Sequence, residues 1–311
     1  MEVDFVTVVF QRDLNLLKLQ ARSIALYVPK NLIRSIIIIC RDEQSPDIIR
    51  NNIVSEYKDL QNKVTVYNNS QFINEKTNEI DNGWFIQQII KLRAYKVCNA
   101  KYHIILDAKN HFISPIDESF FFKNGKPLQV LENCKTYLMR NYIINSLNVF
   151  ENHKNSTSSV LYYTEENAPY FQTLLTPVIF KTDICKEIDS IMILEEFINS
   201  QVHCAEFALY AAYLKFKDIE DEYIRTDKQF SCTSYSSEDL ENKLQIIPSY
   251  SLIGISSSIF NTLTENQKNV IIELWVKANL CLPEEAVHLF ELLTKTNYSV
   301  NFKGEWAYAL F

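Results

Sequence analysis

Glycine is scarce in this chain, which has only 4 glycines among its 311 residues. Phosphate-binding loops of the Walker type and the dinucleotide-binding Gly-x-Gly-x-x-Gly motif both need several closely spaced glycines. Neither motif occurs in the sequence. If the protein binds a phosphate group, then side chains, a metal ion or helix N-termini must hold it.

Paired cysteine motifs are also missing, although the chain has 7 cysteines. Their number is odd, no two of them form a Cys-x-x-Cys pair, and several lie inside apolar runs. This pattern predicts reduced, buried thiols in a cytosolic protein, rather than disulfides or a zinc site.

Long apolar segments are absent from the sequence. No stretch approaches the roughly 20 apolar residues that a membrane-spanning helix needs. The first residues, Met-Glu-Val-Asp-Phe, lack the basic region and apolar core of a signal peptide. We therefore expect a cytoplasmic protein, either free or attached peripherally to the inner membrane.

Positive charge is not in excess, because 31 Lys and Arg residues face 38 Asp and Glu residues, for a formal net charge of -7. This balance argues against nucleic acid as a partner. A hydrophobic content of 47% is ordinary for a well-packed globular protein. The length and the lack of repeats or linkers favour a single domain with two lobes.

The first part of the chain alternates predicted strands and helices. Apolar, β-branched runs at 4–10, 35–40 and 63–67 predict buried strands. Amphipathic patterns at 14–27 and 47–57 predict helices between them. The resulting β-α-β-α-β order is typical of a parallel, Rossmann-like sheet in an α/β protein.

The same periodicities predict the remaining elements. Helices are expected at 84–98, 184–199, 204–216, 265–280 and 283–294. Strands are expected at 102–106 and 175–180, with one or two more within 240–254. Two irregular segments are expected, a turn-rich one with exposed aromatic residues at 119–127 and a polar, mobile loop at 151–159.

The most informative segment surrounds the predicted strand at 102–106. This continuous apolar run ends abruptly in Asp107, Lys109 and Asn110. Such a run is typical of a strand that is buried on both faces. In open α/β sheets, ligands bind just beyond the carboxyl ends of the strands. An acid, a base and an amide at that place favour a polar, phosphate-bearing ligand such as a nucleotide sugar.

Two segments carry a resemblance to a known family. Trp84-Phe-Ile-Gln-Gln-Ile-Ile-Lys-Leu-Arg-Ala-Tyr95 and Leu106-Asp-Ala-Lys-Asn-His-Phe112 resemble a bacterial family of uncharacterised GT-A-like glycosyltransferase proteins from surface-polysaccharide (capsule or O-antigen) gene clusters. Glu206-Phe-Ala-Leu-Tyr210, the Thr176-Pro177 strand and Gly254-Ile255 fit the same pattern. The resemblance extends from the first strand to the helix that contains Trp275.

The resemblance implies a GT-A-like fold, with a Rossmann-like, mostly parallel central sheet, flanking helices and an irregular helical C-terminal lobe. It implies one domain over 1–311, with a nucleotide-binding half at 1–115 and an acceptor-side half with C-terminal helices at 116–311. The implied function is transfer of a sugar from a nucleotide sugar, with a UDP-sugar as the expected donor, to a saccharide or lipid-linked acceptor. Two alternatives stay open: a sugar-phosphate transferase of capsule assembly, and a non-catalytic binding or scaffold module.

One departure from the family pattern concerns the metal. GT-A enzymes usually carry Asp-x-Asp at this strand end to hold Mg²⁺ or Mn²⁺, whereas this chain has Asp107-Ala108-Lys109. A protonated lysine cannot be a metal ligand. Either Asp107 binds Mn²⁺ or Mg²⁺ with another acid or histidine, or Lys109 itself neutralises the leaving phosphate without a metal.

The candidate catalytic residues are Asp107, Lys109 and Glu206, with Glu206 as the base that takes the proton of the acceptor hydroxyl. Structural alternatives stand beside several assignments. Asp13 could cap the helix at 14–27, and Glu206 could be buried with a partner. Gln87 and Lys91 could lie on a solvated helix face, and His203 could be structural. Asn110 could shape a turn instead of binding a sugar hydroxyl. The candidate substrate-binding residues are Phe10, Asp13, Arg41, Trp84, Gln87, Lys91, Asn110, Thr176, His203 and Tyr210.

Overall fold

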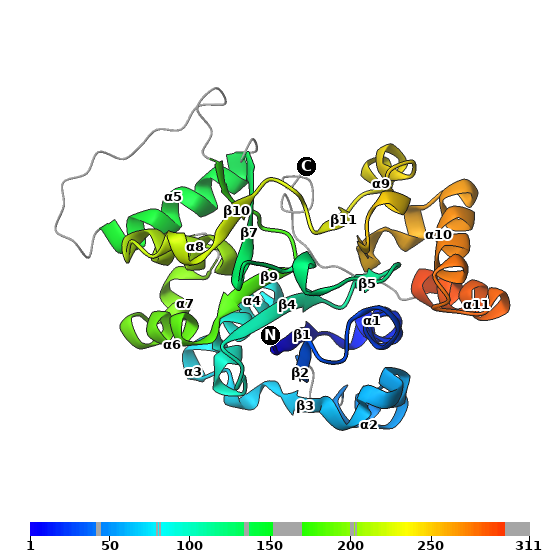
Figure 1. Cartoon of the computed structure of the whole chain (residues 1–311), viewed down its shortest axis with the longest axis horizontal. Helices are drawn as coiled ribbons and strands as arrows, with labels where there is room; N and C mark the ends of the chain where they lie inside the picture. Colours follow the sequence, from blue (N-terminus) through cyan, green and yellow to red (C-terminus); the bar gives the residue numbers. More distant parts are fainter. Residues whose placement is uncertain are drawn as a thin grey trace. The chain divides into compact units, whose positions relative to one another are not determined.

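The computed structural model describes residues 1–41, 45–78, 80, 82–133, 137–151, 170–199, 202 and 204–295 (Figure 1). The chain folds as two compact units, each built from segments that are separate in sequence. The first unit comprises Met1–Asn68, Ile104–Phe120 and Gln229–Val300. The second comprises Asn69–His103, Phe121–Lys228 and Asn301–Phe311.

The first unit is built on a sheet whose strand order is β3-β2-β1-β4. These strands are β1 (Val3–Val9), β2 (Ile33–Cys40), β3 (Val64–Asn68) and β4 (Tyr102–Asp107), of which β4 enters this unit at Ile104. β1 pairs in parallel with β2, and β2 pairs in parallel with β3. Every residue of β1 is buried, including the polar Asp4 and Thr7, which agrees with its mostly apolar sequence.

Helix α1 (Leu14–Tyr27) has the bounds that the apolar periodicity predicts. It packs against the sheet through buried residues that include Leu16, Leu17 and Gln20. The next helix was predicted at 47–57 but differs from that expectation: α2 (Ser45–Asn52) ends early and a 3-10 helix covers Val54–Lys63. Two asparagines, which are poor helix formers, stand at the end of α2.

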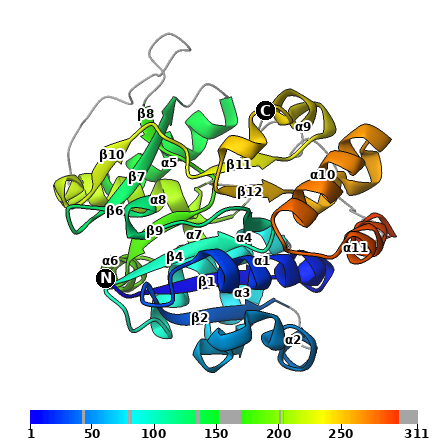
Figure 2. The same cartoon turned by 45° about the vertical axis from the view of Figure 1, so that its right-hand side comes forward.

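A second, three-stranded sheet belongs to the first unit, with the order β11-β12-β5. β11 (Ser231–Ser234) runs parallel to β12 (Leu252–Ile255), and both are labelled in Figure 2. β12 runs antiparallel to β5 (Asn110–Phe112). The prediction of one or two strands within 240–254 is therefore met by β12. The first residues of that predicted range belong to helix α9 (Ser237–Lys243), which the Ser236 side chain caps by accepting from the Asp239 N–H.

The C-terminal helices of the first unit are α10 (Glu265–Lys277) and α11 (Pro283–Lys295), close to the predicted ranges. Thr264 and Gln267 form a capping box at the start of α10. The Trp275 ring is fully buried. Its centroid lies 6.2 Å from that of the Phe260 ring and 6.3 Å from that of the Phe290 ring. These aromatic contacts attach both helices to the core of the unit.

The second unit combines helices with short strands. Its described helices are α3 (Glu75–Asn78), α4 (Gly83–Arg93), α5 (Tyr137–Glu151), α6 (Thr182–Ile191), α7 (Leu194–Phe197) and α8 (Glu206–Phe216). Its strands include β6 (Phe122–Lys123), β7 (Lys126–Asn133), β8 (Tyr170–Gln172), β9 (Val178–Lys181) and β10 (Ile224–Thr226). β7 pairs with β6, β8 and β10. The residues of α8 from Glu206 to Leu214 are all buried, as expected for a helix that is apolar all round.

Several predictions in this unit need correction. The strand predicted at 175–180 begins only at Val178, because Pro177 has no N–H for a ladder hydrogen bond. The helix predicted at 84–98 ends at Arg93 and continues as a 3-10 turn. The aromatic residues expected to be exposed within 119–127 are instead covered, since Phe121 and Phe122 are 0% and 3% exposed beside the β6-β7 turn.

The helix predicted at 184–199 is broken into α6 and α7. The ion pairs of Arg93 with both helices give a reason for the break. The Arg93 guanidinium bonds Asp189 of α6 at 3.0 Å and Glu195 of α7 at 2.6 Å. Residues six apart in one continuous helix point in different directions. The break therefore allows both carboxylates to reach the same buried guanidinium.

The predicted fold class is confirmed as mixed α/β, with a mostly parallel sheet and flanking helices. None of the described helices is both long enough and apolar enough to cross a bilayer. The described cysteines are all buried free thiols, as the sequence predicts. The loop predicted at 151–159 lies outside the described residues, except for Glu151 at the end of α5.

His111 is a fully buried histidine whose protonation state is set by its neighbours. The Trp275 indole donates to His111 Nε2 at 3.0 Å, so this nitrogen must be the acceptor. The other ring nitrogen then donates to the Lys109 carbonyl at 3.1 Å. Burial lowers the pKa of His111 to about 4, although the hydrogen bond to Lys109 acts in the opposite direction.

This burial predicts a pH-dependent stability. Below about pH 6.5 the unfolded chain binds a proton at His111, whereas the folded protein does not until about pH 4. The free energy of unfolding should therefore fall as the pH drops from 6.5 to 4, by at most ~1.4 kcal/mol per pH unit from this group. Urea denaturation across this range should show a shallower fall for His111→Gln. The exposed His288 supplies the control, since His288→Gln should follow the wild-type profile.

Candidate functional site

Several strands of the first unit end at one edge with polar or aromatic residues. Phe10 to Asp13 follow β1, Arg41 follows β2, and Asp107 ends β4. In the small sheet, Tyr235 follows β11 and Ser257 follows β12, and the two strands are parallel. β5 is antiparallel to β12 and pairs Asn110 with Gly254, so Lys109 lies at that same edge. We name the following residues the strand-end cluster: Phe10, Arg12, Asp13, Arg41, Asp107, Lys109, Tyr235 and Ser257.

Lys109 and Asp107 form the centre of the strand-end cluster. The Lys109 ammonium donates to Asp107 Oδ2, and the two side chains are 14% and 17% exposed. The ammonium also lies 5.0 Å from the centroid of the Tyr235 ring. Burial disfavours the charge, but the Asp107 carboxylate and Tyr235 outweigh it and raise the pKa of Lys109 above its usual value. The lysine is therefore a permanent cation that stays within reach of solvent.

The turn between β4 and β5 is held in place from inside the unit. The Asn110 amide oxygen accepts from the Asp107 N–H at 2.8 Å. The Gln20 amide of α1 donates to the Asp107 carbonyl at 2.7 Å and to the Asn110 carbonyl at 3.1 Å. Thr7 of β1 in turn donates to Gln20 Oε1 at 2.8 Å. Asn110, predicted as a substrate contact, is fully buried and shapes the turn that presents Lys109.

Gly254 makes this arrangement possible on the side of the small sheet. A Cβ at this position would lie 2.7 Å from Thr233 Oγ1 and 2.9 Å from Asn110 Nδ2. Both distances are shorter than real Cβ contacts, so a side chain would push β12 away from the turn. Glycine is therefore required here for close approach of two strands.

Asp13 occupies the N-cap position of α1, but among the described residues its side chain forms no capping hydrogen bond. Instead it accepts from the Ser257 hydroxyl at 2.6 Å. Burial raises the pKa of Asp13, while Ser257, Arg12 and Lys109 act to lower it. The structure thus favours a place in the strand-end cluster over the alternative that Asp13 caps the helix.

Two arginines add positive charge to this edge. The Arg12 guanidinium lies 5.1 Å from the centroid of the Phe10 ring, and its side chain is 46% exposed. The Arg41 N–H donates to the Val9 carbonyl, which places this residue beside the end of β1. Among the residues that the structure describes at this edge, the cations Arg12, Arg41 and Lys109 stand against the carboxylates Asp13 and Asp107. This charge balance suits a multiply charged anion.

The sequence did not point to Tyr235 or Ser257. Both follow short strands of the small sheet, and β11 reads Ser-Cys-Thr-Ser, without the apolar run that marks β4. The hydrogen bond from Ser257 to Asp13 joins residues that are 244 positions apart. A strand-end rule applied to β11 and β12 would have found both residues, but only after these strands were known.

The second unit contains the other predicted residues. Lys91 of α4 and Glu206 of α8 form an ion pair at 3.1 Å, with side chains that are 6% and 5% exposed. The Glu206 N–H donates to the Gln88 amide oxygen at 3.1 Å. The Lys91 ammonium also lies 5.1 Å from the centroid of the Phe207 ring. Of the two roles considered for Glu206, the structure shows the buried, partnered arrangement.

The remaining predicted residues are dispersed within the second unit. Trp84 is 36% exposed and packs against Tyr142, and Gln87 is half-buried on α4. Thr176 is buried just before β9. The buried Tyr210 hydroxyl accepts from the Lys181 N–H and shares a hydrogen bond with the Tyr223 hydroxyl. His203 lies outside the described residues.

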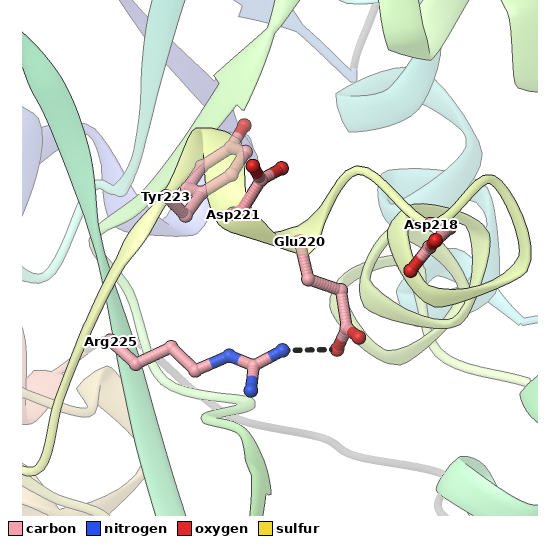
Figure 3. Close-up of a pocket in the computed structure, with 5 residues that line it drawn as sticks. All are labelled: Asp218, Glu220, Asp221, Tyr223 and Arg225. Carbon is pink, nitrogen blue, oxygen red and sulfur yellow. Dashed lines mark ion pairs between the residues drawn. The ribbon is translucent and has the colours of Figure 1, made fainter.

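A separate hollow of about 520 Å³ opens in the second unit (Figure 3). Arg225 pairs with Glu220 at 2.5 Å inside it. With three carboxylates against one guanidinium, this hollow would repel a phosphate group. Its described lining residues, none of which was predicted as a site residue, are Asp218, Glu220, Asp221, Tyr223 and Arg225.

The metal expectation can be compared with the donor set at Asp107. In the described part of the chain, no group of three or more His, Cys, Asp or Glu side chains is arranged to hold a metal ion. The Asp107 carboxylate already forms an ion pair with the Lys109 ammonium. A divalent cation needs several oxygen ligands and would be repelled by that ammonium. The described residues therefore do not fit Mg²⁺ or Mn²⁺ at this position.

Residues 7–245 match the model of a protein family that is described as a family of unknown function, DUF6492. The chain belongs to this family. No curated protein matches it.

Several solved structures are similar to this DUF6492 protein. The apo structure of the bifunctional glycosyltransferase WbbM is 9% identical, covers 94% of this chain and 51% of its own, and has a TM-score of 0.53. The galactosyltransferase LgtC, in complex with donor and acceptor sugar analogs, is 8% identical, with 95% and 98% coverage and a TM-score of 0.49. The apo glycosyltransferase GlyE of Streptococcus pneumoniae TIGR4 is 10% identical, with 95% and 64% coverage and a TM-score of 0.47.

This DUF6492 chain thus spans about half the length of the WbbM chain (51%). The similarity to WbbM extends over nearly all of the present chain, and at such low identity it concerns the fold alone. The fold expected from the sequence, an α/β fold of the kind found in glycosyltransferases, is confirmed.

The buried pair of Lys91 and Glu206 generates a stability prediction. Glu206→Gln removes the carboxylate that lies 3.1 Å from the buried Lys91 ammonium and should lower the free energy of unfolding by about 3–5 kcal/mol. Lys91→Met combined with Glu206→Gln should recover most of that loss, because no charge is then buried alone. Urea denaturation of the two single variants and the double variant measures the coupling.

The matched control is the exposed pair of Lys76 and Glu196, which has nearly the same separation, 3.0 Å, but side chains that are 52% and 54% exposed. Glu196→Gln should change the free energy of unfolding by less than about 1 kcal/mol. A Glu206→Gln variant as stable as this control would contradict the assignment of a buried ion pair.

Proposed function

We propose that this protein is a glycosyltransferase. In this proposal it moves a sugar from a nucleotide-sugar donor, with a UDP-sugar as the expected donor, to a hydroxyl of a saccharide or lipid-linked acceptor in bacterial surface-polysaccharide synthesis. The observation that carries the proposal is the strand-end cluster, which gathers three cationic residues where α/β folds bind their ligands. The fold shared with a bifunctional glycosyltransferase supports the same class of reaction.

The reaction breaks the bond between the anomeric carbon of the sugar and the phosphate oxygen, and the bonding electrons leave with the nucleoside diphosphate. A new bond forms between that carbon and the acceptor oxygen, which loses its proton to a base. Negative charge therefore develops on the diphosphate, and cations fixed at that place stabilise it in the transition state. Lys109, Arg12 and Arg41 are the groups proposed for this role.

The other cluster residues suit the nucleoside part of the donor. The Phe10 ring is half-buried, and the Arg12 guanidinium lies over it. This ring offers a stacking surface for the nucleotide base. Asp13 offers carboxylate oxygens to ribose hydroxyls, and Ser257 fixes one of these oxygens. Both roles follow from side-chain chemistry and from the position of these residues after β1.

Glu206 stays the proposed base for the acceptor hydroxyl. Because it is buried and paired with Lys91, a loss of activity in its variants has two possible origins. A structural role lowers activity only in proportion to the folded fraction. A catalytic role lowers kcat in protein that is fully folded and that binds the nucleotide normally.

An acceptor carried on a lipid would bring the protein to the inner surface of the membrane, as a peripheral partner.

A thermal-shift series tests the donor proposal. The full chain is heated with increasing concentrations of UDP, UDP-sugars and the corresponding derivatives of other bases. A true donor at 100 times its Kd stabilises the folded protein by about 2.7 kcal/mol, so the Tm of a chain of this length should rise by roughly 4 °C. Lys109→Ala should lose most of this rise.

The control for this series is Lys277→Ala, in which an exposed lysine of the same unit is removed, and it should keep the full rise. The absence of any rise with every nucleotide and nucleotide sugar would contradict the proposal. Mass spectrometry of the product gives a second check, because an acceptor that gains a sugar together with a phosphate would indicate a sugar-phosphate transferase instead.

A further inference from the structure

The strand-end cluster carries its own cation in the place where a metal ion would be expected. A nucleoside diphosphate has several negative charges, and its binding requires positive charge nearby. The Lys109 ammonium, which pairs with Asp107, supplies such a positive charge. In the described part of the chain, no group of three or more His, Cys, Asp or Glu side chains is arranged to bind a metal ion instead.

We infer that Lys109 takes over the role of a divalent cation, so that this protein binds the diphosphate of its donor without a metal. This inference rests on the proposed function, since it concerns the same donor site. Asp107 then acts as a positioning residue, which holds the ammonium instead of ligating a metal.

The geometry around Lys109 supports this division of roles. An ammonium has three N–H donors. In the described structure, Asp107 accepts one of them and the Tyr235 side chain takes up a second interaction. With a side chain that is 14% exposed, the ammonium can direct the remaining donor to a phosphate oxygen from the solvent side.

The surroundings of Lys109 also fix its position. The backbone of the turn is held by Gln20 through two carbonyls and by Asn110 through the Asp107 N–H. His111 bonds the carbonyl of Lys109 itself. A cation fixed in this way needs little rearrangement when charge develops on the leaving group, which is the property that makes a fixed charge effective in catalysis.

The deciding experiment measures UDP binding by isothermal titration calorimetry, once with excess EDTA and once with Mn²⁺. Wild-type protein should bind UDP with EDTA within about threefold of its affinity with Mn²⁺. Lys109→Met, which keeps the length of the side chain but not its charge, should bind about 10–100-fold more weakly with EDTA. Lys277→Met should bind like the wild type in both conditions.

Lys109→Asp reverses the charge and tests the same inference in the opposite direction. It places a second carboxylate two residues after Asp107, as oxygen ligands for a divalent cation. UDP binding by this variant should be lost with EDTA and restored in part by Mn²⁺. If this variant does not fold, the wild-type and Lys109→Met measurements decide the matter without it.

A double variant tests the positioning role of Asp107. If Asp107 acts only through Lys109, then Asp107→Asn combined with Lys109→Met should bind UDP no more weakly than Lys109→Met alone. If Asp107 holds a metal, the added substitution should weaken binding further when Mn²⁺ is present.

The outcomes separate the two proposals. Wild-type binding that appears only with Mn²⁺, or a Lys109→Met variant that binds normally with EDTA, overturns the metal-free inference and leaves the glycosyltransferase proposal standing. If wild-type protein binds no nucleoside diphosphate of any base in either condition, both proposals are wrong.

Discussion

The Lys109 side chain is only 14% exposed, so its positive charge needs a compensating partner. The strand-end cluster depends on the interactions that provide this compensation. The Asp107 carboxylate and the Tyr235 side chain stabilise the charge, so Lys109 stays protonated in a place where burial alone would favour the neutral amine. Hydrogen bonds between the side chains of Gln20, Asn110 and His111 and the backbone of Asp107 and Lys109 hold this group in position. The close approach at Gly254 completes the arrangement, because it brings the small sheet against the same turn.

Two of the lysine-carboxylate pairs among the described residues, Lys91–Glu206 and Lys109–Asp107, differ in what surrounds them. Lys91 and Glu206 are 6% and 5% exposed and lie among the buried residues of α8. Their charges cancel, and a buried pair of this kind opposes the removal of either partner. Lys109 and Asp107 are more accessible, and Arg12 and Arg41 at the same edge leave an excess of positive charge. The first pair is thus suited to hold two helices together, and the second to attract an anion.

The hollow of the second unit and the strand-end cluster of the first unit differ in their balance of charge. The hollow at Tyr223 is lined mainly by carboxylates, and its arginine is already paired with Glu220. The strand-end cluster has the opposite balance. For a ligand that carries phosphate groups, electrostatics favours the cluster over the hollow. A net charge of -7 for the whole chain therefore says little about the charge at the site.

The local sequence determined most of the elements and the centre of the site. The apolar periodicity of α1 defined its bounds, and the abrupt change from Leu106 to Asp107 marked the end of β4, because both are patterns between neighbours in the chain. Only the tertiary structure decided which distant groups meet. Tyr235 reaches Lys109 and Ser257 reaches Asp13, while Glu206 is paired with Lys91. The break between α6 and α7 likewise follows from Arg93, a residue about a hundred positions away. Periodicity reports only which face of an element is buried, whereas the partner of a buried charge is set by the packing of segments far apart in sequence.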